Sequence, residues 1–231
     1  MRRNRKSSGT AGIIIAIMLI IGLIASLPKE LIIALISTSI ILPIIIIIIK
    51  SPTIKGFIGE LIVSLAISKT STENKVQYII NNIILKDETG KTSQIDHIII
   101  NQNGVYVIET KNYKGTIYGD EWNFNWIQEL NNGNQYEFYS PIRQNQTHMN
   151  MVLNAIQMQV PIYSIIIFVR GNIDNVNSNK VYKLKSFVEK EKSNERKRIS
   201  IETVDEIYSI LIDYKNNPRA TIKEHIDNIT Q

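Results

Sequence analysis

The 231-residue chain contains no cysteine, which excludes disulfides, thiolate zinc sites and a cysteine nucleophile. Its length suits one domain plus an anchor rather than two large cores. Its formal charge of +5 comes mostly from residues 1–49, which hold five Lys or Arg and one acid, so the near-neutral remainder gives no bulk argument for a polyanionic partner.

Two long uncharged segments lie near the N-terminus, at residues 10–27 and 31–49. Each is long enough for a helix that crosses a bilayer. Only residues 28–30 separate them, so we expect a membrane anchor over residues 1–50 in which two transmembrane helices form an antiparallel hairpin. The alternatives are a buried helical hairpin of a soluble protein and, for the first segment, a signal peptide.

Basic residues flank both outer ends of this hairpin. Arg2, Arg3, Arg5 and Lys6 precede the first segment and Lys50 and Lys55 follow the second, whereas the connection between the segments has one lysine. The positive-inside rule therefore predicts a multi-pass protein of the cell membrane, with both termini and the soluble domain in the cytoplasm.

Beyond Pro52 the pattern alternates between helical and strand periodicity. It predicts helices over residues 56–68, about 141–159 and 203–214, and strands over residues 76–85, 94–100, 105–111 and 163–169, with a weaker strand over 181–184. Residues 112–140 read as a short hairpin and an irregular surface excursion, and residues 171–180 as a polar loop. This order indicates an α/β sandwich around a mixed sheet.

Charged residues interrupt two of the apolar strands. Glu109 and Lys111 share a face of residues 105–111 by strand alternation, and Asp96 interrupts the neighbouring strand. Residues 101–104 carry a strong hairpin signal, and pairing through this hairpin would bring Asp96 towards Glu109.

Two carboxylates and a lysine suit the hydrolysis of phosphodiesters. Carboxylate oxygens select a hard cation such as Mg²⁺, with Mn²⁺ as the alternative. Such an ion stabilises the charge that develops on phosphate and lowers the pKa of a bound water, while the lysine orients that water or helps to deprotonate it.

Several short motifs carry a family resemblance. They are Gly56-x-x-Gly59-Glu60, Gln94-Ile95-Asp96-His97-Ile98, the run from Gly104 to Gly115 that contains Glu109-Thr110-Lys111, and Pro141-x-x-Gln144-Asn145-x-x-His148. Over roughly residues 52–170 the chain resembles the nuclease-related domain (NERD) family of the PD-(D/E)xK nuclease-like superfamily, with Ile95 in place of the proline. The resemblance implies a restriction-endonuclease-like α/β/α sandwich as the core, which leaves residues 171–231 as a C-terminal α/β extension packed on it. Transmembrane segments are frequent in similar proteins.

The resemblance also implies roles for the matching residues. Asp96 and Glu109 would be metal ligands, with the carbonyl of Thr110 as a candidate third, and Lys111 would lie beside the attacking water. Glu60 matches an additional acid that serves as a ligand or supports one. Gln144 matches a polar residue near the scissile phosphate, and His148 follows one helical turn later on the same face.

Each of these residues also has a purely structural interpretation. Asp96, Glu109 and Lys111 would then form a buried ion network, and Glu60 would be an acid favoured by the helix dipole. Gln144 and His148 would lie on the outer surface of their helix. His97, on the opposite face from Asp96, reads as a core histidine rather than a ligand.

Two further groups of residues remain open at this stage. Trp122, Trp126, Tyr136 and Tyr139 either stack on bases or pack the excursion onto the domain. The basic run over residues 190–198 is interleaved with glutamates and reads as a solvated face.

The sequence therefore leads to two functions of different class, and it leaves open a third, in which the soluble domain mainly mediates assembly at the membrane. The first is a membrane-anchored, metal-dependent nuclease that hydrolyses nucleic acid, with DNA preferred over RNA by analogy with the family. The second is a non-catalytic module, tethered to the membrane, that binds or senses nucleic acid.

Overall fold

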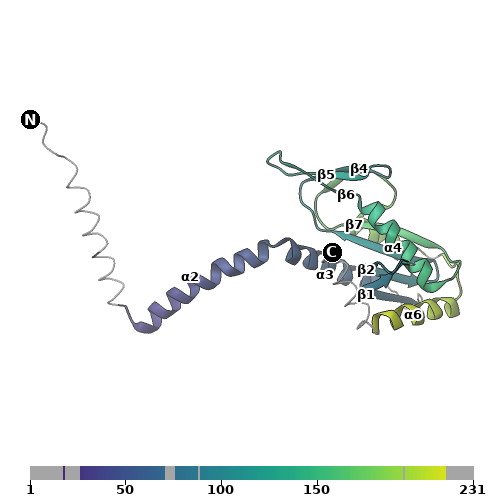
Figure 1. The fold of residues 1–231 in the computed structure, drawn as a ribbon, viewed down its shortest axis with the longest axis horizontal. Helices are drawn as coiled ribbons and strands as arrows, with labels where there is room; N and C mark the ends of the chain where they lie inside the picture. The colour runs from purple at the N-terminus through teal and green to yellow at the C-terminus, as the bar shows by residue number, and fades with distance from the viewer. Residues whose placement is uncertain (1–17, 19–26, 71–75, 88, 195, 217–231) are drawn as a thin grey trace, which may run out of the picture. The chain divides into compact units, whose positions relative to one another are not determined.

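A computed structural model describes residues 18, 27–70, 76–87, 89–194 and 196–216 (Figure 1). The chain divides into two compact units, residues 1–54 and 55–231. The division of the soluble part at residue 170, which the sequence suggests, stays a prediction.

The described part of the first unit contains one helix long and apolar enough to cross a membrane, α2 (Lys29–Lys50). None of its side chains is buried, and it continues through Pro43. Lys29 and Lys50 lie at its two ends, as expected for a segment whose charges mark its limits. Nearly all of the first predicted span, residues 10–27, lies outside the described residues, so a two-helix hairpin stays a prediction.

The second unit is a mixed α/β domain with two mixed sheets. The larger sheet has the strand order β1-β2-β3-β7-β9; the first three strands are antiparallel and β3, β7 and β9 are parallel. Its strands are β1 (Gln77–Lys86), β2 (Thr92–Asn101), β3 (Gly104–Lys111), β7 (Ile162–Phe168) and β9 (Val181–Lys183). These confirm the strands expected from the apolar runs.

Helices cover both faces of this sheet because its strands are apolar on both sides. On one face, α4 (Pro141–Ile156) and α6 (Ile201–Asn216) pack through Met151, Val152 and Leu211 against β1, β2 and β3. On the other face, α3 (Pro52–Ile67) and α5 (Leu184–Lys192) pack through Val63, Ile67 and Phe187. In β3, Val105 and Val107 face the first pair of helices, and Tyr106 and Ile108 face the second.

The second sheet corrects the expectation of an irregular excursion over residues 112–140. It has the order β6-β5-β4-β8, and its strands are β4 (Thr116–Asp120), β5 (Asn125–Glu129), β6 (Gln135–Tyr139) and β8 (Asn172–Asn177). Strands β4, β5 and β6 are only five residues long and contain many polar residues, so they lack the apolar alternation that marks a strand.

Strand β8 corrects a second expectation, the polar loop over residues 171–180. It pairs in parallel with β4, far away in the sequence. Helix α5 likewise overlaps the charged stretch that the sequence left unassigned. In both segments, contacts within the folded domain stabilise a strand or helix that the polar sequence alone does not predict.

Candidate active site

The register of β2 and β3 brings the predicted acidic pair to one end of the larger sheet. His97 pairs with Ile108, so Asp96 comes level with Glu109. The backbone N–H of Thr110 donates a hydrogen bond to Asp96 Oδ2, with 2.8 Å between N and O. This bond holds the Asp96 carboxylate against β3.

Glu109 and Lys111 form a buried ion pair on the face of β3 that packs against α4. Lys111 Nζ lies 2.6 Å from Glu109 Oε1, and only 3% of the Glu109 side chain is exposed. Lys111 Nζ also donates a hydrogen bond of 2.9 Å to Gln144 Oε1 in the first turns of α4. The predicted lysine, glutamate and glutamine are therefore in direct contact.

The second carboxylate oxygen of Glu109 has a different environment. Among the described residues Oε2 is buried and has no hydrogen-bond partner. The Nδ1 atom of His148, on α4, lies 3.5 Å away and also has no partner, while its Nε2 is 3.0 Å from Ser93 Oγ. Burial and the charge of Lys111 lower the pKa of His148 to about 4, so this histidine is neutral at pH 7 and does not balance the carboxylate.

The charges of the cluster alter one another's protonation. Burial, followed by the charge of Glu109, raises the pKa of Asp96 to about 8, although the Thr110 hydrogen bond acts against this. Burial also raises the pKa of Glu109, against the effect of Lys111. Burial alone would lower the pKa of Lys111, but Glu109 outweighs it and the net shift is upward. Lys111 is therefore a cation at neutral pH, and Asp96 carries a proton over much of the neutral range.

Glu60 reaches this cluster from α3. Burial raises its pKa, and its charge in turn raises the pKa of both Asp96 and Glu109, which places it within electrostatic range of the pair. The preceding Gly59 makes the approach of the helix possible, because a Cβ there would lie 2.7 Å from Asn112 Cβ. Asn112 Nδ2 also donates to the carbonyl of Lys55 at 2.6 Å. The second glycine of the Gly-x-x-Gly-Glu motif thus has a packing reason.

Helix α4 presents Gln144 and His148 to the cluster and not to the outer surface. Asn145, quoted in the sequence motif without a role, fixes this orientation. Its buried Nδ2 donates to the carbonyl of Val107 at 2.8 Å and to Ser164 Oγ at 2.9 Å. The contacts of His148 with Ser93 and Glu109 were missed at the sequence level, where only the spacing from Gln144 gave a signal.

The structure separates the aromatic residues that the sequence left open. Trp126 is fully buried and stacks on Phe168 with 6.4 Å between ring centroids, so it packs the second sheet onto the domain. Trp122 is 84% exposed, and Tyr136 and Tyr139 are about half exposed. His97 is buried, as expected, with Nδ1 2.8 Å from Asn81 Oδ1 and its pKa lowered to about 4 by burial.

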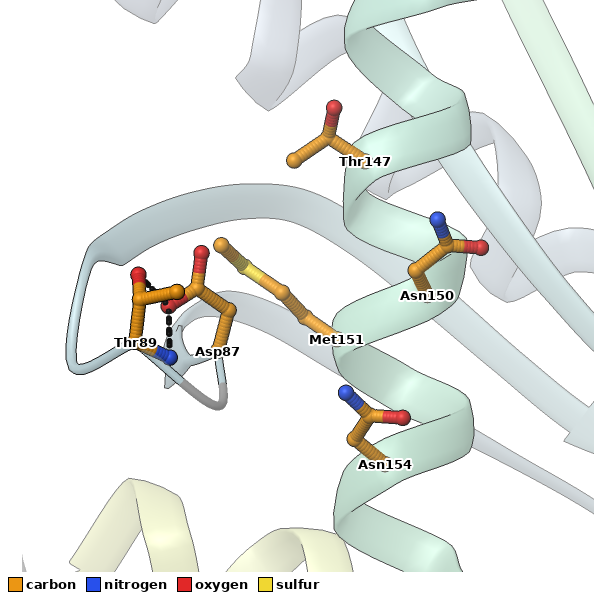
Figure 2. A pocket seen from close by; sticks show the side chains of 6 residues that line it. All are labelled: Asp87, Thr89, Thr147, Asn150, Met151 and Asn154. Carbon is orange, nitrogen blue, oxygen red and sulfur yellow. Dashed lines mark hydrogen bonds between the residues drawn. The ribbon is translucent and has the colours of Figure 1, made fainter.

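A cavity of about 400 Å³ lies between α4 and the turn that joins β1 to β2 (Figure 2). It is lined by Asp87, Thr89, Thr147, Asn150, Met151 and Asn154. The backbone N–H and the hydroxyl of Thr89 both donate hydrogen bonds to Asp87 Oδ1 (Figure 2). None of the predicted site residues lines this cavity, so the candidate site rests on the Asp96–Glu109–Lys111 cluster alone.

The fold and this cluster together define a class: an α/β domain that gathers acidic side chains and a lysine at one end of a mixed sheet. Residues 55–169 match the family described as the nuclease-related domain. The chain belongs to this family, and the matched residues include the whole cluster and the second-sheet strands β4, β5 and β6.

A curated relative extends the comparison without adding a function. The uncharacterized protein pXO1-01 of Bacillus anthracis is 38% identical over 117 residues, which cover 51% of this chain and 54% of the relative. The chain thus spans about half the length of the curated relative it matches. No solved structure matches the chain.

Proposed function

We propose that this chain is a membrane-anchored, metal-dependent nuclease that hydrolyses phosphodiester bonds of nucleic acid, DNA in preference to RNA. Membership of the nuclease-related domain family supports the substrate class. The observation that carries the proposal is the contact set of the cluster, in which Lys111 joins Glu109 to Gln144 and Asp96 is bonded to the same strand.

The carboxylate oxygens of the cluster are ligands that suit a hard divalent cation. Glu109 Oε2 is a buried carboxylate oxygen without a hydrogen-bond partner in the described structure, and Asp96 is the neighbouring acid. No group of three or more His, Asp or Glu side chains is arranged to hold a metal among the described residues. Mg²⁺ is commonly held by one or two carboxylates together with waters and substrate phosphates, so the fit favours Mg²⁺, or Mn²⁺, over zinc.

Asp96 and Glu109 would hold this cation, with the Thr110 carbonyl as a further oxygen, and Glu60 would support the pair through its charge. When bound, the ion supplies charge stabilisation for the phosphate and a water of lowered pKa. These three ligands, with Glu60, Lys111 and Gln144, make up the proposed site.

Lys111 is protonated, so its part is to donate hydrogen bonds and to place a positive charge near a phosphate oxygen or the attacking water. A role as general base is not favoured in this protonation state. Gln144 accepts one N–H of Lys111 and so fixes the direction of the amine. His148 is neutral. Its Nε2 contacts Ser93 Oγ in β2 and its Nδ1 lies near Glu109 Oε2, so it helps to hold α4 beside Glu109.

The finer architecture is part of the same proposal. The helices on both faces of the larger sheet fit a restriction-endonuclease-like α/β/α sandwich with a mixed sheet. The apolar helix α2 fits anchoring in a lipid bilayer. A second span over residues 10–27, a multi-pass topology and a cytoplasmic domain are the sequence's predictions. A reporter fused after Gln231 that is active only on the cytoplasmic side would support them, and activity on the other side would refute them.

The decisive experiment incubates the full chain, purified in detergent, with single- and double-stranded DNA and RNA, with and without Mg²⁺ or Mn²⁺. We expect cleavage only with the metal, and none by Asp96→Ala. Equal cleavage by Asp96→Ala would refute the assignment. Binding without cleavage by the intact chain would favour the rival function, a tethered module that binds or senses nucleic acid.

A further inference from the structure

One face of α3 carries large apolar side chains that stay exposed in the described domain. They follow each other at helical spacing, and each is at least about one third exposed: Phe57 58%, Ile58 36%, Leu61 47%, Ile62 37% and Leu65 58%. The opposite face of the same helix packs on the sheet through Val63 and Ile67. An exposed apolar stripe of this kind on a soluble domain marks an interaction surface.

The stripe continues into a groove between α3 and α5. Two hollows of about 560 and 270 Å³ lie along it and share Ala66, Val188 and Lys192 in their lining. The lining of these hollows includes three exposed lysines, Lys69, Lys185 and Lys192. Glu189 is the one acid among the lining residues. The surface therefore combines apolar side chains with an excess of positive charge.

The chain itself connects this surface to the apolar helix. Helix α2 ends at Lys50 and α3 begins at Pro52, so six residues separate a segment long enough to span a bilayer from Phe57, where the exposed stripe begins. Lys50 and Lys55 add two further charges at the junction. A stripe this close in sequence to a membrane span cannot lie far from the bilayer surface.

We propose that this surface, which we call the α3 lipid face (Phe57, Ile58, Leu61, Ile62, Leu65 and Lys69 with Lys185, Val188 and Lys192), lies in the headgroup region of the bilayer that α2 spans. The apolar side chains enter the boundary of the acyl chains, and the lysines contact anionic headgroups. This proposal rests on the membrane anchoring proposed above. It adds that the nuclease-related domain is held against the membrane in one orientation and does not hang from a free linker.

Charge favours lipid over a second copy of the chain as the occupant. A symmetric pair would place the same lysines of two copies against each other, and repulsion would oppose the contact. Anionic headgroups neutralise these lysines, so lipid as the occupant removes the repulsion.

The absence of cysteine from the chain makes the test clean. Leu61→Cys places a single thiol on the α3 lipid face, and Glu206→Cys places one on an exposed position of α6 as the matched control. Each variant of the full chain is labelled with an environment-sensitive fluorophore. It is then reconstituted into vesicles of equal parts phosphatidylcholine and phosphatidylglycerol, with or without brominated acyl chains.

We expect brominated lipid to quench the label at Leu61→Cys at least about twofold more than at Glu206→Cys, with aqueous iodide showing the opposite order. In the Leu61→Cys background, Lys185→Glu with Lys192→Glu should reduce the lipid quenching, because it reverses the charge of the rim. Unchanged quenching in this variant would refute the role given to the lysines.

Three other results would overturn the proposal, and they differ from one another. Equal iodide quenching at both positions would show that the face is in water. Protection from iodide without lipid quenching, and dependent on the ratio of protein to lipid, would assign the face to a second copy. A chain that does not float with vesicles would refute the anchoring as well, whereas its nuclease activity would be unaffected by any of these outcomes.

Discussion

Two buried glutamates in this domain show how similar burial can serve different ends. Glu109 lies in β3 and Glu191 in α5, and they are 3% and 2% exposed. Glu191 Oε1 accepts a hydrogen bond from Asn101 Nδ2 at 3.0 Å, and Oε2 accepts one from Asn194 Nδ2 at 3.5 Å. Both oxygens of Glu191 thus have donors, which ties α5 to the end of β2.

Glu109 is satisfied on one oxygen only. Oε1 holds Lys111, whereas Oε2 has no hydrogen-bond partner within the described residues. An incompletely satisfied buried carboxylate lowers stability, and this environment fits the cation that we propose for the site. The contrast teaches that completeness of hydrogen bonding, more than burial, separates the two environments.

The largest expected effect comes from removing the charge of each glutamate in turn. Glu109→Gln keeps the shape of the side chain but removes a cation ligand, so we expect metal-dependent hydrolysis to fall by about 10³-fold or more. Glu191→Gln should leave the turnover number near that of the unmodified chain and should lower the free energy of unfolding by about 1–3 kcal/mol. The measurements are kcat with Mg²⁺ and denaturant unfolding for both variants. Similar activity losses in both would erase the distinction between the two sites.

The next effect concerns the lysine that completes the ion pair. Lys111→Met removes the positive charge beside the proposed phosphate site, and we expect kcat to fall by about 10²-fold. Lys180→Met is the matched control, because Lys180 also pairs with a glutamate, Glu121 at 2.9 Å, but on the surface. Rates with a single-stranded oligonucleotide compare the two. If Lys180→Met were as damaging as Lys111→Met, general loss of charge would explain the result.

A third prediction tests how α3 reaches the site end of the sheet. Gly59→Ala places a Cβ against Asn112 and should cost about 1–3 kcal/mol of stability. It should also reduce activity, because Glu60 moves with the helix. Gly56→Ala, in the same helix with nothing within 4 Å of the added Cβ, should instead stabilise by about 0.5–1 kcal/mol. Denaturant unfolding of the two variants measures their free energies of unfolding. Equal stability of the two variants would contradict the packing argument.

The larger sheet was predictable because its physics is local. The runs at residues 98–100 and 165–168 are apolar enough to be strands only in a covered sheet, and the turn at residues 101–104 sets the register of β2 and β3. The same register made the meeting of Asp96 and Glu109 foreseeable, because a charge in a buried strand stands out from its neighbours.

The second sheet and the support of the site were not predictable in the same way. Strand β8 is held by pairing with β4, more than fifty residues earlier, and neither strand has an apolar pattern of its own. The contact of His148 with Glu109 depends on how α4 docks through Asn145, which no spacing encodes. In the sequence Glu191 is one acid among basic residues, and only the position of α5 reveals that it is buried.

The smallest expected effect is on the pH dependence of stability, and it concerns Asp96, the neighbour of Glu109. The pKa of Asp96 is raised to about 8, so between pH 4 and 8 the folded state holds a proton that the unfolded state has released. Stability therefore falls as pH rises through this range. His97 and His148, with pKa values lowered to about 4, act in the opposite direction up to about pH 6.5, where the unfolded histidines lose their protons.

Between about pH 6.5 and 8 the histidine effect is therefore absent and the carboxyl effect remains, to which Asp96 contributes no more than about 1.4 kcal/mol per pH unit for its one proton. Asp96→Asn removes that proton, so the variant should show a flatter slope in thermal unfolding with a chelator present. Adding Mg²⁺ should stabilise the unmodified chain more at pH 8 than at pH 6.5, because the cation competes with the proton, and should do little for Asp96→Asn. A slope that is the same in both proteins would mean that Asp96 is already ionised at neutral pH. The raised pKa of Asp96, which distinguishes the surroundings of Glu109 from those of Glu191, would then be wrong.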